Sequence, residues 1–118
     1  MPENIIIHKE AGFIEVFSYG KVTLEMMNFS LGKVTELVRG MGLRGLLVDT
    51  TDQETMPGTI KTYSFATNLP RSFKIAVVVS EEQPTLEDLH FFETVARNRA
   101  LMVKNFFSRE KAIAWIAR

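Results

Sequence analysis

Two aspartates, Asp49 and Asp52, come closest to a reactive site by residue type and position. Asp49 ends the apolar segment Gly45–Asp49, and Asp52 and Glu54 follow it closely. In open α/β sheets ligands gather beyond the carboxyl ends of the strands, so this group could hold a divalent cation or accept a phosphoryl group. Such a site also needs a second acidic cluster and a lysine after a later strand, and no lysine directly follows Phe73–Val79. We therefore expect a solvated acidic loop, with phosphotransfer or hydrolysis by Asp49 and Asp52 as the less favoured alternative.

Threonine hydroxyls follow these aspartates along the chain. Thr50, Thr51 and Thr55 precede a helix that Pro57-Gly-Thr59 can open. Because a helix N-terminus tolerates added negative charge, Thr59 is a candidate phosphosite. Threonines also cap helices and form turns, so Thr59 is at the same time the expected cap of this helix.

Other reactive side chains are scarce. The chain has no cysteine, and its two histidines, His8 and His90, share no ligand spacing. Thiolate chemistry is thereby excluded and a zinc site is disfavoured. No glycine-rich loop follows a strand, as a dinucleotide fingerprint requires. We expect no catalytic residue, no metal site and no cofactor.

The hydrophobic pattern predicts the elements that must position these residues. Strands are expected at 5–8, 13–19, 45–49, 73–79 and 103–107, a polar loop at 50–56, and helices capped by Thr23, Thr59, Thr85 and Ser108. The order ββαβαβαβα predicts an α/β fold with a mixed, mostly parallel sheet of about five strands and about four helices.

The helical spacing also predicts which side chains are buried. Met41 and Met102 fall on the apolar sides of the first and third helices, and Trp115 on that of the last helix, together with Ala112 and Ile116. We expect Trp115 to be structural.

Aromatic residues suggest a surface as well as a core. Phe13, Phe17 and Tyr19 share one face of the second strand by period-two alternation, so this face is a candidate for an apolar ligand or a partner. Adjacent phenylalanines cannot both face inward, so one of Phe91/Phe92 and one of Phe106/Phe107 should be less buried.

Composition limits the class of protein. A chain of 118 residues with 46% hydrophobic and 24% charged residues reads as a single domain over residues 1–118. Its net charge of +0 disfavours nucleic acid as a partner. The longest apolar run, Ile75–Val79, is far shorter than the ~20 residues of a membrane span, and the start lacks the basic region of a signal peptide. We expect a cytoplasmic protein without a membrane span.

Three stretches, Gly45-Leu-Leu-Val-Asp49, Phe73-Lys-Ile-Ala-Val-Val-Val79 and Phe107 followed by Ala112-Ile-Ala-Trp115-Ile116, resemble the SpoIIAA-like family, relatives of the STAS domain. The resemblance implies a SpoIIAA-like fold over nearly the whole chain, with helices mostly over one sheet face. Sporulation-type antagonists of this group carry a phosphorylated Asp-Ser-Ser-Gly-type motif; here Thr55–Thr59 lacks the Asp-Ser pair, so only Thr59 could stand in. Members of the wider group also resemble the lipid-binding CRAL-TRIO domain, which implies an apolar ligand.

These observations together predict a non-enzymatic cytoplasmic binding or regulatory module that acts through protein–protein interaction in signalling. Its expected binding surface consists of Asp49, Thr50, Thr51, Asp52, Thr59 and Tyr63. The expected partner is another protein or a second copy of the chain in a homodimer. The alternative is a carrier or sensor of a small apolar, lipid-like ligand.

Overall fold

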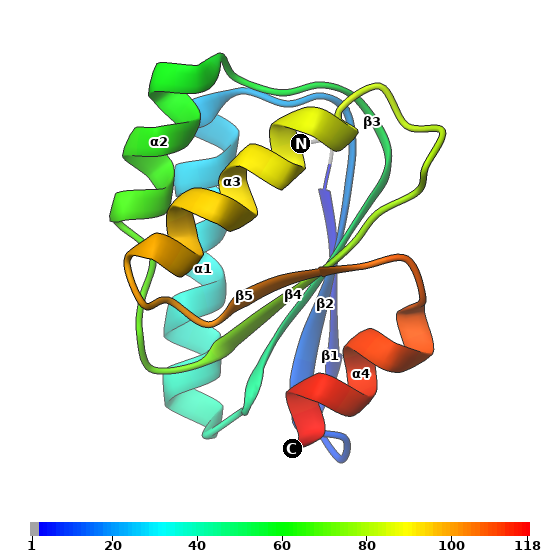
Figure 1. Ribbon diagram of the computed structural model, residues 1–118. Helices are drawn as coiled ribbons and strands as arrows, with labels where there is room; N and C mark the ends of the chain where they lie inside the picture. Colours follow the sequence, from blue (N-terminus) through cyan, green and yellow to red (C-terminus); the bar gives the residue numbers. More distant parts are fainter. Residues whose placement is uncertain (1–2) are drawn as a thin grey trace.

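The structure is a computed structural model that describes residues 3–118. Its elements follow the predicted order ββαβαβαβα (Figure 1). The strands are β1 (Glu3–His8), β2 (Phe13–Lys21), β3 (Gly45–Thr55), β4 (Lys74–Val78) and β5 (Val103–Phe106). The helices are α1 (Leu24–Met41), α2 (Thr59–Thr67), α3 (Leu86–Asn98) and α4 (Arg109–Ala117).

The strands form one sheet whose spatial order, β1-β2-β3-β4-β5, repeats the chain order. β1 is antiparallel to β2, and the other neighbours are parallel. Parallel crossovers share one hand, so a sheet that grows in one direction places its crossover helices on one face. Figure 1 shows α1, α2 and α3 on that face and α4 on the other. The predicted mixed, mostly parallel sheet is confirmed.

The expected loop at 50–56 is wrong for most of its length, because β3 continues to Thr55. Beyond Asp49, β3 has no partner on β4 but still pairs with the end of β2, where Tyr19 lies opposite Asp52 and Lys21 opposite Thr55. The register shifts twice in this stretch. Polar residues with such irregular pairing lack the apolar alternation by which strands are predicted.

Two apolar cores lie on the two faces of the sheet. The larger core joins β2, β3 and β4 to α1, α2 and α3, with Val16, Val34, Phe65 and Phe92 among its buried members. The smaller core lies under α4 and consists of Phe13, Leu47, Ala76, Val78, Ala112 and Ile116. The alternation along β2, with Phe13 on one side and Ile14 on the other, supplies both cores.

Two of the four predicted helix caps are confirmed. The hydroxyl of Thr23 accepts a hydrogen bond from the Met26 N–H, and that of Ser108 from the Lys111 N–H. In α2, Gly58 rather than Thr59 is the N-cap, and Thr59 is the first helical residue. Thr85 is the N-cap residue of α3, but its hydroxyl donates to Gln53 instead of capping the helix.

Some predicted burial is also corrected. Met41 lies exposed in the last turn of α1, and Met102 is exposed in the segment after α3. Trp115 is half-buried, with its ring centroid 5.7 Å from that of Phe106. Phe107 is exposed while Phe106 is half-buried, and Phe91 is less buried than Phe92, so the expectation for adjacent phenylalanines is confirmed.

Helix length and composition bear on the predicted lack of a membrane span. Within residues 3–118, none of the helices is long and apolar enough to cross a bilayer. The cytoplasmic location stays a prediction.

Candidate functional site

Asp49 and Asp52 lie on β3 and face the same side of the sheet as Phe17 and Tyr19. Phe17 pairs with Asp49 and Tyr19 with Asp52, so two steps on β2 match three on β3, which therefore carries one extra residue. The carboxylate of Asp49 accepts hydrogen bonds from the N–H of Thr51 at 3.0 Å and from its hydroxyl at 2.7 Å. Asp49 is therefore engaged within its own strand.

The other predicted site residues lie elsewhere. Thr50 is buried on the opposite sheet face, where its hydroxyl donates to the Val78 carbonyl at 2.8 Å. Thr59 and Tyr63 are exposed on α2, one helical turn apart. The six predicted residues thus occupy three separate places. In the described chain, no three acidic or histidine side chains cluster as metal ligands would.

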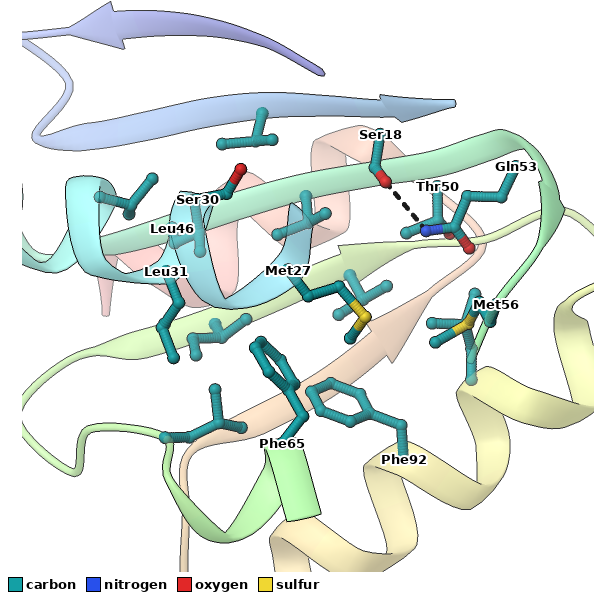
Figure 2. A pocket seen from close by; sticks show the side chains of 17 residues that line it. Ser18, Met27, Ser30, Leu31, Leu46, Thr50, Gln53, Met56, Phe65 and Phe92 are labelled. Atoms are coloured by element: carbon teal, nitrogen blue, oxygen red, sulfur yellow. Dashed lines mark hydrogen bonds between the residues drawn. The ribbon is translucent and has the colours of Figure 1, made fainter. Parts of the chain in front are cut away.

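A cavity of about 90 Å³ lies between the sheet and helices α1, α2 and α3. Most of its lining is apolar, with Val16, Leu46, Val48, Ile75 and Val77 from the sheet and Met27, Leu31, Val34, Met56, Phe65, Leu69, Leu89 and Phe92 from the helices and loops. Four of the lining residues are polar: Ser18, Ser30, Thr50 and Gln53. Figure 2 shows Ser18, Thr50 and Gln53 gathered at one end and Phe65 and Phe92 on another side.

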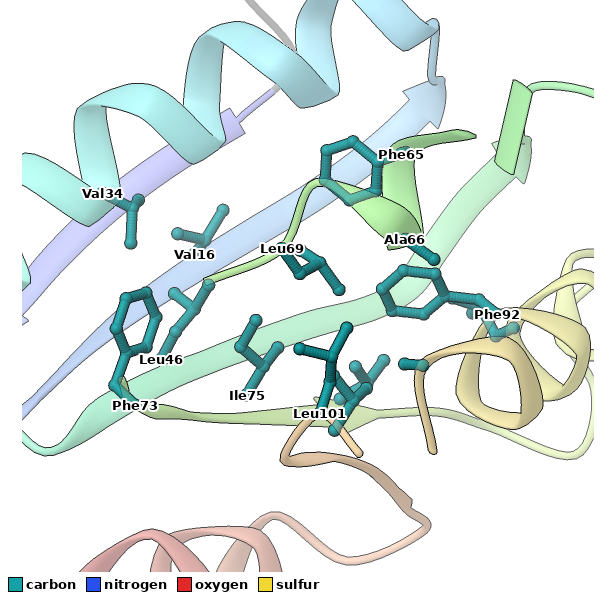
Figure 3. Close-up of a cluster of buried hydrophobic side chains, with 14 of the residues drawn as sticks. Val16, Val34, Leu46, Phe65, Ala66, Leu69, Phe73, Ile75, Phe92 and Leu101 are labelled. Carbon is teal, nitrogen blue, oxygen red and sulfur yellow. The ribbon is translucent and has the colours of Figure 1, made fainter. Parts of the chain in front are cut away.

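The apolar side of the cavity merges into the larger core. Figure 3 shows Phe65 of α2 and Phe92 of α3 among the buried side chains over the sheet, and their ring centroids are 6.0 Å apart. Met27 and Met56 line the same space and are only partly buried. Because methionine side chains are unbranched and adapt their shape, these two can move to admit a ligand at modest cost.

A buried hydrogen-bond network closes the polar end. The amide nitrogen of Gln53 donates to the Ser18 hydroxyl at 3.0 Å, and the Gln53 amide oxygen accepts from Thr85 at 3.1 Å. The amide nitrogen of Gln83 donates to Thr85 at 2.9 Å and to the Thr50 carbonyl at 3.1 Å. Satisfied buried networks rigidify their surroundings, so this end of the cavity is a fixed polar wall.

The sequence analysis missed this polar wall. Ser18 and Gln53 face the cavity because of strand alternation and the extra residue in β3, which the sequence alone does not reveal. Ser30 did carry a signal: it lies three residues after Met27 and four before Val34, on the apolar stripe of α1. A serine on such a stripe indicates either a local hydrogen bond or a polar spot in a pocket.

The opposite sheet face holds an ionic cluster centred on Glu15, which is 1% exposed. Arg109 donates to both carboxylate oxygens, at 3.0 and 2.8 Å, and the His8 ring lies 2.8 Å from Oε1. The hydrogen bonds from Arg109 lower the pKa of Glu15; burial opposes this, and the bond to His8 lowers the pKa further. This pairing ties β1, β2 and the start of α4 together.

The cluster and α4 also change the predicted aromatic surface. Phe13 is 2% exposed, because α4 packs over it and the His8 ring stacks on it at 4.6 Å. Phe17 is half-buried and Tyr19 is more exposed. The expected continuous aromatic face is therefore wrong at Phe13: the last helix covers part of the sheet face that was expected to be open.

No protein-family model and no curated protein matches the chain. A solved structure is similar to it: that of an uncharacterised protein of the DUF3478 family with a SpoIIAA-like fold, from Shewanella loihica PV-4. The two superpose with a TM-score of 0.62 over 97% of this chain and 91% of that one, at 17% identity. The chain has the SpoIIAA-like fold. The resemblance seen in the sequence is thereby confirmed, and at this identity the likeness concerns the SpoIIAA-like fold alone.

Proposed function

We propose that this SpoIIAA-like protein is a non-enzymatic binding module that holds a small apolar molecule in the cavity between the sheet and α1–α3. The cavity of about 90 Å³ is the observation that supports the proposal. Protein interiors contain few voids larger than a water molecule, and an apolar cavity of about 150 Å³ is large enough to bind benzene or xenon. This is the carrier or sensor alternative of the sequence analysis.

The exposure of several lining residues favours a cavity that takes up a ligand from solvent over a closed packing defect. Leu31, Met27, Val48 and Met56 line the cavity yet remain partly exposed. Ligand pockets are mostly apolar with a few placed polar groups, which is the composition of this lining. The engagement of the Asp49 carboxylate with Thr51 further favours binding over phosphotransfer.

Xenon is a suitable first probe, because it is apolar, carries no charge and fits small cavities. With methionine methyl groups labelled with ¹³C, we expect xenon to shift the Met27 and Met56 signals and to leave that of the exposed Met102 unchanged. Val48→Phe, which extends a ring into the cavity, should abolish these shifts. Met41→Phe, an exposed change on α1, should keep them. Absence of any shift, or an equal shift in Val48→Phe, would contradict the proposal.

A second candidate function is protein–protein interaction, self-association included. Exposed apolar side chains on the outside of α1 and α2 favour it: Ile60 is 85% exposed, and Phe29 and Tyr63 are also exposed. Aromatic residues are enriched at binding hot spots, and Thr59 and Tyr63 of the predicted surface belong to this side of α2. The exposed side of α1 and α2 favours a different protein as the partner, whereas self-association would use the edge strand β1. The mass of the particle in solution, measured by light scattering, tests self-association.

A further inference from the structure

Backbone groups fix the orientation of Gln83 in the buried network, and the hydroxyl of Thr85 passes this direction on to Gln53. The Ser80 N–H, which can only donate, bonds the Gln83 amide oxygen at 2.6 Å. The Gln83 nitrogen is therefore the donor, and it bonds the Thr50 carbonyl, which can only accept. Asn and Gln orientations are otherwise open to a flip; here the backbone fixes that of Gln83 at both ends.

The same direction carries through to Ser18. Thr85 accepts from Gln83 and has one hydrogen, which it gives to the Gln53 oxygen. The Gln53 nitrogen must then be the group that faces Ser18, and the serine hydroxyl accepts from it. A hydroxyl has one donor hydrogen besides its acceptor lone pairs. In the hydrogen bonds recorded across residues 3–118, Ser18 acts only as an acceptor, so its own hydrogen is available at the cavity wall.

The Thr50 hydroxyl offers no such hydrogen. It donates to the Val78 carbonyl at 2.8 Å and accepts from Gln83 at 3.3 Å. The polar end of the cavity therefore presents Ser18 as a hydrogen-bond donor that the network itself orients.

The lining also restricts the charge of a ligand. None of the 17 residues that line the cavity in the described chain is Asp, Glu, Lys, Arg or His. An ion that enters an apolar space without a counter-charge loses its hydration without compensation. The site therefore excludes ligands that carry a carboxylate or an ammonium group, such as fatty acids and amines.

We propose that the cavity selects a small neutral molecule with one hydrogen-bond acceptor, such as a ketone or alcohol oxygen on a short hydrocarbon body, and that Ser18 donates to this oxygen. This inference rests on the proposed function, because it names the class of ligand that the same cavity takes. The size of the cavity restricts the hydrocarbon body to a few carbon atoms unless Met27 and Met56 move.

Four probes with five non-hydrogen atoms each test the selection: 2-butanone, 2-chlorobutane, propionate and n-butylammonium. Binding is followed through the ¹³C-methyl signals of Met27 and Met56. We expect 2-butanone to bind about three- to tenfold more tightly than 2-chlorobutane, which offers a poor acceptor, because one neutral hydrogen bond contributes that much. The two ions should cause no shift. Equal binding of 2-butanone and 2-chlorobutane, or binding of either ion, would overturn the selection while leaving the proposed function intact.

Failure of the proposed function gives a different pattern, in which none of the four probes shifts either methyl signal and xenon does not either. The role of Ser18 is tested by Ser18→Ala, which should bring the affinity for 2-butanone down to that for 2-chlorobutane. Ser64→Ala, on the exposed side of α2, should keep the difference. A difference that persists in Ser18→Ala would refute its role as donor. The four-probe comparison on the unaltered protein does not depend on how well this variant folds.

Discussion

At the scale of the residue, Glu15 shows how the sheet face under α4 tolerates a buried charge. A carboxylate that is 1% exposed is costly unless it is paired and hydrogen-bonded. Arg109 supplies two bonds from α4, and His8 supplies a third contact from β1. The acid on β2 therefore positions both the first strand and the last helix, on the face that the sequence analysis had described only by its aromatic residues.

We expect Glu15→Gln to lower the free energy of unfolding at pH 7 by about 1.5–3 kcal/mol, the usual contribution of hydrogen bonds to a charged group. Because folding lowers the pKa of Glu15, the stabilisation is fully present above the unfolded carboxyl pKa of about 4.3. It is lost as the pH falls through the lower folded value. Urea unfolding at pH 7 and near pH 3 should show the gap between the two proteins narrowing. Glu36→Gln, exposed on α1, is the control; a gap that stays constant with pH would contradict the assignment.

At the scale of the element, Gly45 determines how closely β3 and β4 approach under α4. A Cβ atom at this position would lie 2.6 Å from the Lys74 carbonyl oxygen and 3.1 Å from a methyl group of Ile116. The nearer atom belongs to the backbone of a central strand, so it cannot move without disturbing the sheet. Only glycine fits at this position, because there is no room for a Cβ atom.

Gly45→Ala should therefore destabilise the protein by about 1–3 kcal/mol, as overpacking does. Gly32→Ala provides a matched control, because Gly32 lies inside α1 with nothing within 4 Å of an added Cβ. It should stabilise the protein by about 0.5–1 kcal/mol through helix propensity. Opposite changes in melting temperature would support both assignments. If Gly45→Ala left the melting temperature unchanged, the close approach of β3 and β4 at this position would be contradicted.

The elements also show which parts of the fold can be predicted from sequence. The apolar segment Gly45–Asp49 and the apolar stripe of α1 can be recognised in the sequence, because buried strands and helix faces require apolar residues in a regular pattern. The second half of β3 does not, since its pairing with Tyr19–Lys21 depends on where β2 ends and on an extra residue. The polar wall of the cavity depends on that same register, so Gln53 could not be placed beside Ser18 without the structure. Tyr63 was correctly placed on a helix, whereas Thr59, the expected cap, is the first helical residue. The role of both residues stays a prediction.

At the scale of the whole molecule, the two edges of the sheet differ. β5 is short, carries Lys104, and is flanked by α3 and α4. β1 is longer, and its exposed Ile6 (45%) and Ile7 (41%) point to opposite faces. Within residues 3–118, nothing pairs with the outer side of β1. Natural proteins protect edge strands with charges, bulges or short length. The segment Ile5–Ile7 of β1 carries no charged residue, and its pairing with β2 contains no bulge.

We expect two copies of the chain to pair antiparallel along β1, so that one ten-stranded sheet results and Ile6 lies opposite its counterpart. A twofold axis makes such an interface self-complementary, and the chain's net charge of +0 adds no repulsion. Light scattering should give twice the mass of one chain. Ile6→Lys should give single chains, because a lysine on an edge strand opposes pairing. Ile60→Lys, the same change at an exposed isoleucine on α2, should leave the pair intact. A single-chain mass for the unaltered protein at high concentration would refute self-association, whereas dissociation by Ile60→Lys alone would move the interface to α2.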